Sequence, residues 1–265
     1  MSFVALLLSL QDVEGGSTER ETPEWDATVP TLHPRVVPLF EEAQSHLPTQ
    51  PSDAHPALYR LSLLEGSVIR PSLRITTLSE MGSLSIPFFL DTLTTRRDLR
   101  IGTRRYRVSE ALLSHSPWAG LSSWADFLAP PYGQTVRLYL GTPLVLPKEA
   151  DTASRYHFPV PCQIFAELAR CWQELGGPPL PIASHDLLPW LLDGSIVLAD
   201  YHLHGCQVPL EGSLQTGFRG WISYQCRSSV EAARVLLTAL SRFAFFAGVG
   251  TGTERGMGET RVTIR

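Results

Sequence analysis

Hydrophobic and polar residues alternate along the second half of the chain in a pattern that predicts a complete series of strands and helices. Strands are indicated where every second residue is apolar, and helices where apolar residues recur every three or four positions. In chain order the predicted elements are strand Val136–Leu140, helix Pro161–Glu174, strands Ser195–Leu203 and Phe218–Cys226, helix Ser229–Phe246 and strand Glu259–Ile264. This order, β-α-β-β-α-β, is that of a ferredoxin-like unit.

The first half of the chain follows the same order less regularly. Its predicted elements are strand Phe3–Leu10, helix Pro34–His46, strands Leu58–Leu64 and Leu73–Leu78, a helical or mixed segment Leu84–Thr94 and strand Arg104–Val108. We therefore expect an α+β protein with two tandem ferredoxin-like (β-α-β-β-α-β) domains. We expect an N-terminal domain over residues 1–128 and a C-terminal domain over 129–265.

Composition excludes several protein classes. The chain has 265 residues, of which 43% are hydrophobic and 18% charged, so a packed globular protein is expected rather than a disordered one. No apolar run approaches the roughly 18 residues that a membrane helix needs, and no membrane partner is expected. The four cysteines have no CxxC spacing, which favours a reducing compartment, and we expect a cytoplasmic protein.

Charge is unevenly distributed, although the net value of −4 argues mildly against nucleic-acid binding. Residues 70–107 contain eight arginines against three acidic residues, and residues 219–265 contain seven against three. Arginine is the better residue for forked contacts to phosphate and for stacking on bases. Lys148 is the one lysine among the 22 basic residues, and a genome rich in G and C would also produce this excess of arginine over lysine.

A glycine-rich segment, GVGTGTERGMGE, occupies residues 248–259. It follows a predicted helix and precedes a strand, the reverse of a dinucleotide-binding fingerprint, and it lacks the GK[ST] of a Walker A loop. Glycine lets a phosphate approach main-chain N–H groups closely, so the segment is either an RNA contact or a tight connection needed for packing. The candidate contact residues are Gly248, Gly250, Gly252, Arg255, Gly256 and Gly258.

This segment, together with the helix end AFFAG before it, resembles the corresponding motif of the CRISPR-associated endoribonucleases that process repeat RNA, in the repeat-associated (RAMP) superfamily. Three more stretches resemble family motifs in the same order: Pro117–Leu128, Gly141–Leu146 followed by Phe158–Trp172, and Phe218–Tyr224 with its leading glycine. The resemblance covers nearly the whole chain.

The resemblance implies a metal-independent endoribonuclease, without a cofactor, that cuts the hairpin of CRISPR repeat RNA. The RNA's own 2′-hydroxyl would attack the adjacent phosphate, leaving a 2′,3′-cyclic phosphate and a 5′-hydroxyl. The implied partners are repeat RNA, the retained guide RNA and other subunits of a CRISPR effector complex. The alternative is a guide-RNA-binding subunit of such a complex that has lost cleavage.

Histidine can serve as the base or the acid of such a cleavage near neutral pH. The resemblance implies a catalytic histidine between the first helix and the second strand, where His33, His46 and His55 lie. His55 has the most suitable position, His33 is the second candidate and His46 fits less well; a site without histidine is the other possibility. Arg60 would stabilise the charge that develops on the phosphorus, or else lie on a solvated face.

Six arginines lie between residues 96 and 107: Arg96, Arg97, Arg100, Arg104, Arg105 and Arg107. Protein–RNA affinity rests largely on phosphate contacts, so we interpret this cluster as a phosphate track, with a solvated basic loop as the alternative.

Two further groups carry weaker signals. His202, His204 and Cys206 have the period of one strand face, but no fourth zinc ligand is evident, so a buried or edge-strand histidine pair is preferred to a metal site or an RNA contact. The tryptophans are interpreted as core residues before base-stacking residues: Trp118, Trp124, Trp172, Trp190 and Trp221.

Overall fold

The computed structural model describes residues 2–13, 59–67, 70–96, 98–101, 104–147, 158–182, 184–210 and 213–265. The chain divides into two compact units. The first comprises Met1–Ser122 with Glu254–Gly256, and the second comprises Ser123–Thr253 with Met257–Arg265. Within the described ranges, no helix is long and apolar enough to cross a membrane.

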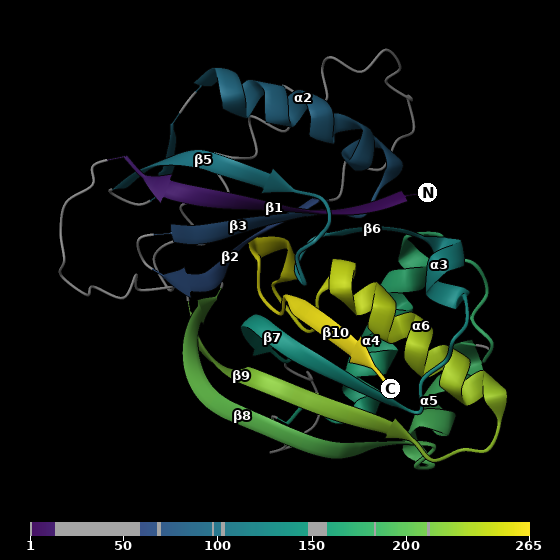
Figure 1. Cartoon of the computed structure of the whole chain (residues 1–265). Helices are drawn as coiled ribbons and strands as arrows, with labels where there is room; N and C mark the ends of the chain where they lie inside the picture. Colours follow the sequence, from purple (N-terminus) through teal and green to yellow (C-terminus); the bar gives the residue numbers. More distant parts are fainter. Residues whose placement is uncertain are drawn as a thin grey trace. The chain divides into compact units, whose positions relative to one another are not determined.

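The first unit is built on an antiparallel sheet (Figure 1). Its elements are β1 (Ser2–Asp12), β2 (Tyr59–Ser67), β3 (Arg70–Thr77), α2 (Glu80–Arg96), β4 (Leu99–Ile101), β5 (Arg104–Leu112) and β6 (Gly120–Ser123). The strand order is β2-β3-β1-β5-β4, with β6 paired to β1. Without the short edge strand β4, this is the order of a ferredoxin-like sheet. The predicted helix Pro34–His46 lies outside the described residues.

Helix α2 packs its apolar side on one face of this sheet. The core on that face comprises Leu6, Leu8, Leu73, Ile75, Ile86 and Phe89, none more than 3% exposed. The helix begins where the Ser79 hydroxyl accepts a hydrogen bond from the Gly82 N–H at 3.0 Å, which satisfies one unpaired donor of the first turn. The segment expected as helical or mixed is therefore a helix, despite Pro87 within it.

The sheet of the second unit has the strand order of a ferredoxin-like sheet, and α3 (Trp124–Leu128) and α5 (Ser184–Leu192) are additional helices. The other elements of this unit are β7 (Thr135–Val145), α4 (Pro161–Glu174), β8 (Ile196–Leu210), β9 (Ser213–Cys226), α6 (Glu231–Ala247) and β10 (Thr260–Ile264). Between α6 and β10 the chain forms a 3₁₀ turn (Thr253–Arg255), most of which is counted with the first unit. The antiparallel order is β10-β7-β9-β8. The prediction of two tandem ferredoxin-like domains is confirmed.

Helices α4 and α6 lie together on one side of the second sheet (Figure 1). An aromatic cluster fills the space beside them, with the Trp124 and Trp172 rings 4.5 Å apart and the Trp124 and Phe243 rings 5.7 Å apart. Trp172 and Phe243 are fully buried. The apolar stripe that predicted α4 is the side of the helix that packs in this core.

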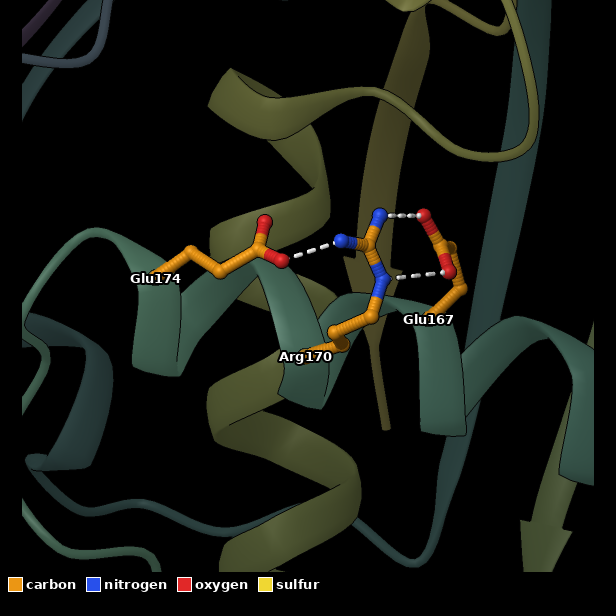
Figure 2. A network of polar contacts seen from close by, with 3 residues as sticks. All are labelled: Glu167, Arg170 and Glu174. Carbon is orange, nitrogen blue, oxygen red and sulfur yellow. Dashed lines mark hydrogen bonds and ion pairs between the residues drawn. The ribbon is translucent and has the colours of Figure 1, made fainter.

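The opposite, exposed side of α4 is occupied by charged side chains (Figure 2). The Arg170 Nε donates to Glu167 Oε2 at 3.0 Å, and another guanidinium nitrogen donates to Glu174. Both partners raise the pKa of Arg170, with the Glu167 hydrogen bond as the largest cause. Exposed pairs one turn apart typically stabilise a helix by about 0.5 kcal/mol, so this network supports α4 without fixing the fold.

Candidate functional site

The histidines proposed for catalysis, His33, His46 and His55, lie outside the described residues, so their roles stay predictions. The strand that follows them is described from Tyr59 onward. Arg60, on that strand, is 9% exposed and therefore lies among buried residues rather than on a solvated strand face.

Arg60 belongs to a buried polar patch on β2 and β3. The register pairs Arg60 with Thr76 and Ser62 with Arg74, so the two arginines are diagonal neighbours across the strands. Arg74 is fully buried, and its Nε donates to the carbonyl oxygen of Trp118 at 2.8 Å. Burial first, and then the charge of Arg60, lower the pKa of Arg74 to about 9. The hydroxyls of Ser62 and Thr76 are buried without a hydrogen-bond partner in the described structure. The two arginines therefore bring positive charge together at buried positions of this sheet.

The predicted phosphate track is distributed over three elements. Arg96 ends α2, Arg100 lies on β4, Arg104, Arg105 and Arg107 lie on β5, and Arg97 lies outside the described residues. The register places Arg100 opposite Arg105, a pairing of like charges that is unfavourable without a counter-charge. Arg105 and Arg107 are both exposed and flank the buried Tyr106, so they lie on the same face of β5. Arg107 also lies 3.8 Å from Asp98.

The glycine-rich segment connects α6 to β10, and its glycines are required by the backbone path. Gly248, Gly250, Gly252, Gly256 and Gly258 all have φ between 64° and 83°. A Cβ on Gly250 would lie 2.2 Å from the Val145 carbonyl oxygen, and one on Gly258 would lie 1.8 Å from that of Val249. The tight-connection interpretation is thus supported, and it is compatible with RNA contact.

Several N–H groups of this segment already have partners inside the protein. Those of Gly248, Val249, Thr251, Met257 and Gly258 each donate to a backbone carbonyl, at distances from 2.7 to 3.1 Å. These five donors are not available to a phosphate. Arg255 is exposed at the 3₁₀ turn, 3.7 Å from Glu254, so its guanidinium is the better candidate for an RNA contact in this segment.

The His202–His204 pair is a hydrogen-bonded pair on β8. Their Nε2 atoms are 2.9 Å apart and both residues are exposed. Among the residues that the structure describes, no group of three or more His, Cys, Asp or Glu side chains is arranged to hold a metal ion. Because β8 is an edge strand of its sheet, the two residues form an exposed, edge-strand histidine pair, one of the two arrangements that we preferred.

The prediction that the tryptophans belong to the core is wrong for Trp221. Trp172 is fully buried, whereas Trp221 is partly exposed on β9, with the guanidinium carbon of Arg137 3.8 Å from its ring centroid. Sequence reasoning also passed over Tyr139 on β7. The signal was present, because both rings fall on the same strand parity as arginines and not on that of the apolar residues.

Comparisons with known proteins find similarity to CRISPR-associated endoribonucleases. The family model for CRISPR-associated endoribonuclease Cas6 matches residues 138–260. A Cas6 product complex is 23% identical with a TM-score of 0.76, covering 99% of this chain and 100% of that chain. Thermus thermophilus Cas6 is 25% identical with a TM-score of 0.69, covering 99% of each chain. A Cas6-related protein from Pyrococcus furiosus is 10% identical with a TM-score of 0.53, covering 98% of each chain. A search of curated proteins gives no match.

Proposed function

We propose that the chain is a CRISPR-associated endoribonuclease of the Cas6 type, because residues 138–260 match that family's model and Cas6 structures match the full chain. In this proposal it cleaves the hairpin of CRISPR repeat RNA by internal attack of a 2′-hydroxyl. The products are a 2′,3′-cyclic phosphate and a 5′-hydroxyl, and the reaction requires no metal ion. The observation that carries this proposal is the match over the full chain to Cas6 structures, which include a product complex and a substrate-mimic complex. The matured guide RNA stays bound for transfer to other subunits of an effector complex.

The chemistry needs a base for the 2′-hydroxyl, an acid for the 5′-oxygen and a cation for the phosphorane charge. We assign proton transfer to His55, with His33 as the second candidate, in the N-terminal domain. In support, one solved Cas6 structure is of a variant in which a histidine is replaced by alanine. Arg60, on β2, and Arg74, on β3, are buried arginines that could supply the positive charge.

The first test is a cleavage assay in excess EDTA, with a hairpin repeat RNA and a copy that carries one 2′-deoxy nucleotide before the scissile bond. Cutting of the first RNA and not of the second is expected. Cutting of the 2′-deoxy copy, or a requirement for added Mg²⁺, would contradict internal attack without metal.

The histidine assignment needs a separate comparison of variants. His55→Ala should lower the cleavage rate by about 10²-fold or more, with RNA binding retained. The matched control is His115→Asn, because His115 is an exposed histidine whose positive φ of 62° asparagine tolerates. Tight RNA binding by the unmodified protein without any cutting would favour the guide-RNA-binding subunit instead.

A further inference from the structure

The second sheet has a face turned away from α4 and α6, and the register defines which residues lie on it. Leu138 and Ile222 are fully buried on the helix side, and they are paired across β7 and β9. Their neighbours Tyr139 and Trp221 are likewise paired, so both rings lie on the opposite face. We call this opposite face, with Arg137, Tyr139, His202, Trp221 and Arg261, the aromatic face.

Rings and guanidinium groups alternate across the aromatic face. The guanidinium carbon of Arg261, on β10, lies 4.3 Å from the Tyr139 ring centroid, and that of Arg137 lies 3.8 Å from the Trp221 centroid. On the far side of Trp221, the His202 ring is inclined by 25° at a centroid distance of 6.3 Å. Four strands therefore contribute flat groups to one row.

Packing alone does not account for this row. The core of the unit lies on the other face, while Tyr139, Trp221 and Arg261 are partly exposed and His202 is exposed. The cation–ring pairs contribute to sheet stability, but apolar residues would cover a strand surface without the cost of desolvating arginines. The two ring–arginine pairs on neighbouring strands are therefore better explained by a ligand that contacts both an aromatic ring and a guanidinium group.

Unpaired nucleotides have the matching chemistry. A base offers a flat face to stack on an aromatic ring or on a guanidinium plane, and the phosphate beside it needs a cation. Each ring–arginine pair supplies both. A four-stranded sheet with aromatic residues on its two central strands is the arrangement by which small RNA-binding domains stack two or three bases. Here β7 and β9 are the two central strands.

We propose that the aromatic face binds unpaired nucleotides of the RNA, with Tyr139 and Trp221 stacking bases and Arg137 and Arg261 contacting phosphates. The inference rests on the proposed function for the source of the RNA, which is the single-stranded part of the repeat transcript outside the hairpin. A paired stem would not fit, because its base faces are covered by stacking.

The test measures fluorescence anisotropy of a labelled single-stranded RNA of about eight nucleotides without any hairpin. Trp221→Ala should weaken binding about tenfold, and Trp221→Phe should recover most of that loss. The matched control is Tyr201→Ala, because Tyr201 is a 52% exposed ring on the same hairpin whose partner, Ile222, lies on the helix side. Equal binding by Trp221→Ala and the unmodified protein, or an equal loss in Tyr201→Ala, would overturn the proposal.

A second measurement separates stacking from a loss of folding. An RNA with an abasic nucleotide should bind more weakly to the unmodified protein, and the same change should have little further effect on Trp221→Ala. Independent, additive losses would overturn the stacking role. Hairpin cleavage by the unmodified protein reports on the proposed function alone: Trp221-dependent binding without cleavage rejects only that function, and cleavage without Trp221-dependent binding rejects only this inference.

Discussion

The guanidinium group of Arg137 lies between the Trp221 ring and the carboxylate of Asp200. Its carbon is 3.8 Å from the ring centroid, and one of its nitrogens is 3.8 Å from Asp200 Oδ2. The ring binds the flat face of the guanidinium, while the carboxylate neutralises its charge. Asp200 therefore competes with any phosphate that approaches Arg137.

Replacement of Asp200 by asparagine should strengthen RNA binding. The Asp200 side chain is 62% exposed, so its ion pair is weak and the expected gain in affinity is about twofold to threefold at low salt. The gain should fade at high ionic strength because the charges are then screened. Anisotropy titrations with single-stranded RNA at several salt concentrations measure this effect.

The control for that variant is Glu174→Gln, which makes the same change of charge on the exposed side of α4. Weaker binding by Asp200→Asn, or an equal gain in both variants, would show that Asp200 does not act on Arg137 in the way described.

Gly258→Ala should destabilise the second unit strongly. Alanine at this position would hold a φ of +64° and place its Cβ 1.8 Å from the Val249 carbonyl oxygen. We expect a loss of about 3 kcal/mol in the free energy of unfolding, measured by urea denaturation.

Alanine variants at two other glycines distinguish the cost of backbone strain from the cost of steric overlap. Gly194 has a φ of +86°, and a Cβ added there would meet nothing within 4 Å, so Gly194→Ala should cost only about 1 kcal/mol. Gly205 has neither a positive φ nor a neighbour, so Gly205→Ala should be close to neutral. Equal losses at all three positions would contradict the crowding argument.

The Tyr224 hydroxyl should make stability fall at alkaline pH. Tyr224 is fully buried, its hydroxyl donates to the Pro159 carbonyl oxygen at 2.8 Å, and burial raises its pKa. Above pH of about 10 the unfolded chain releases this proton and the folded protein keeps it, so the contribution to stability is full below that pH and is lost as pH rises.

The predicted slope is a loss of about 1.4 kcal/mol per pH unit above pH of about 10, in the difference between the unmodified protein and Tyr224→Phe. At neutral pH the free energy of unfolding of Tyr224→Phe should be lower by about 1 kcal/mol, because the variant lacks the hydrogen bond to Pro159. Urea denaturation at a series of pH values gives both numbers. A pH-independent difference between the two proteins would contradict the prediction.

Arg242 should stabilise the segment of residues 126–131, which leads from α3 toward β7. Its guanidinium donates to the carbonyl oxygens of Asp126, Phe127, Ala129 and Pro131 at and beyond the end of α3. Arg242→Met would remove these four hydrogen bonds, and we expect a loss of about 3 kcal/mol in the free energy of unfolding.

Arg242→Lys should recover only part of that loss, because an ammonium group cannot span the same four acceptors. The control is Arg234→Met, which removes an exposed arginine from the same helix. Similar denaturation midpoints for Arg242→Met and Arg234→Met would contradict the role assigned to Arg242.

The elements that were predicted well from the sequence are those in which the buried residues form an uninterrupted pattern along the chain. Helix α4 has the predicted bounds because its apolar stripe faces the core without interruption, and β1 was predicted from a continuous apolar run that is buried on both faces. Helix α5 was missed because it is short and contains Pro189. The edge strand β4, with three residues, is too short for any alternation to be visible.

The candidate site was less predictable because its placement depends on pairing between strands. The interpretation of Trp221 as core used its residue type and ignored its parity with Arg219 and Ser223 on β9. The diagonal placement of Arg60 and Arg74 follows from the register of β2 and β3, which no local pattern reveals. The histidine assignment rests on the family resemblance, because the three histidines lie outside the described residues.

The pairing of β10 with β7 has a consequence for the speed of folding. Thr260 pairs with Leu140, so segments about 120 positions apart must meet before the sheet is complete. Helix α6 and the β8–β9 hairpin are each held by contacts between residues that are close in the sequence. Both can therefore form much earlier than the β7–β10 pair. We expect substitutions in β10 to accelerate unfolding while leaving the folding rate nearly unchanged, so this edge strand sets the lifetime of the folded unit.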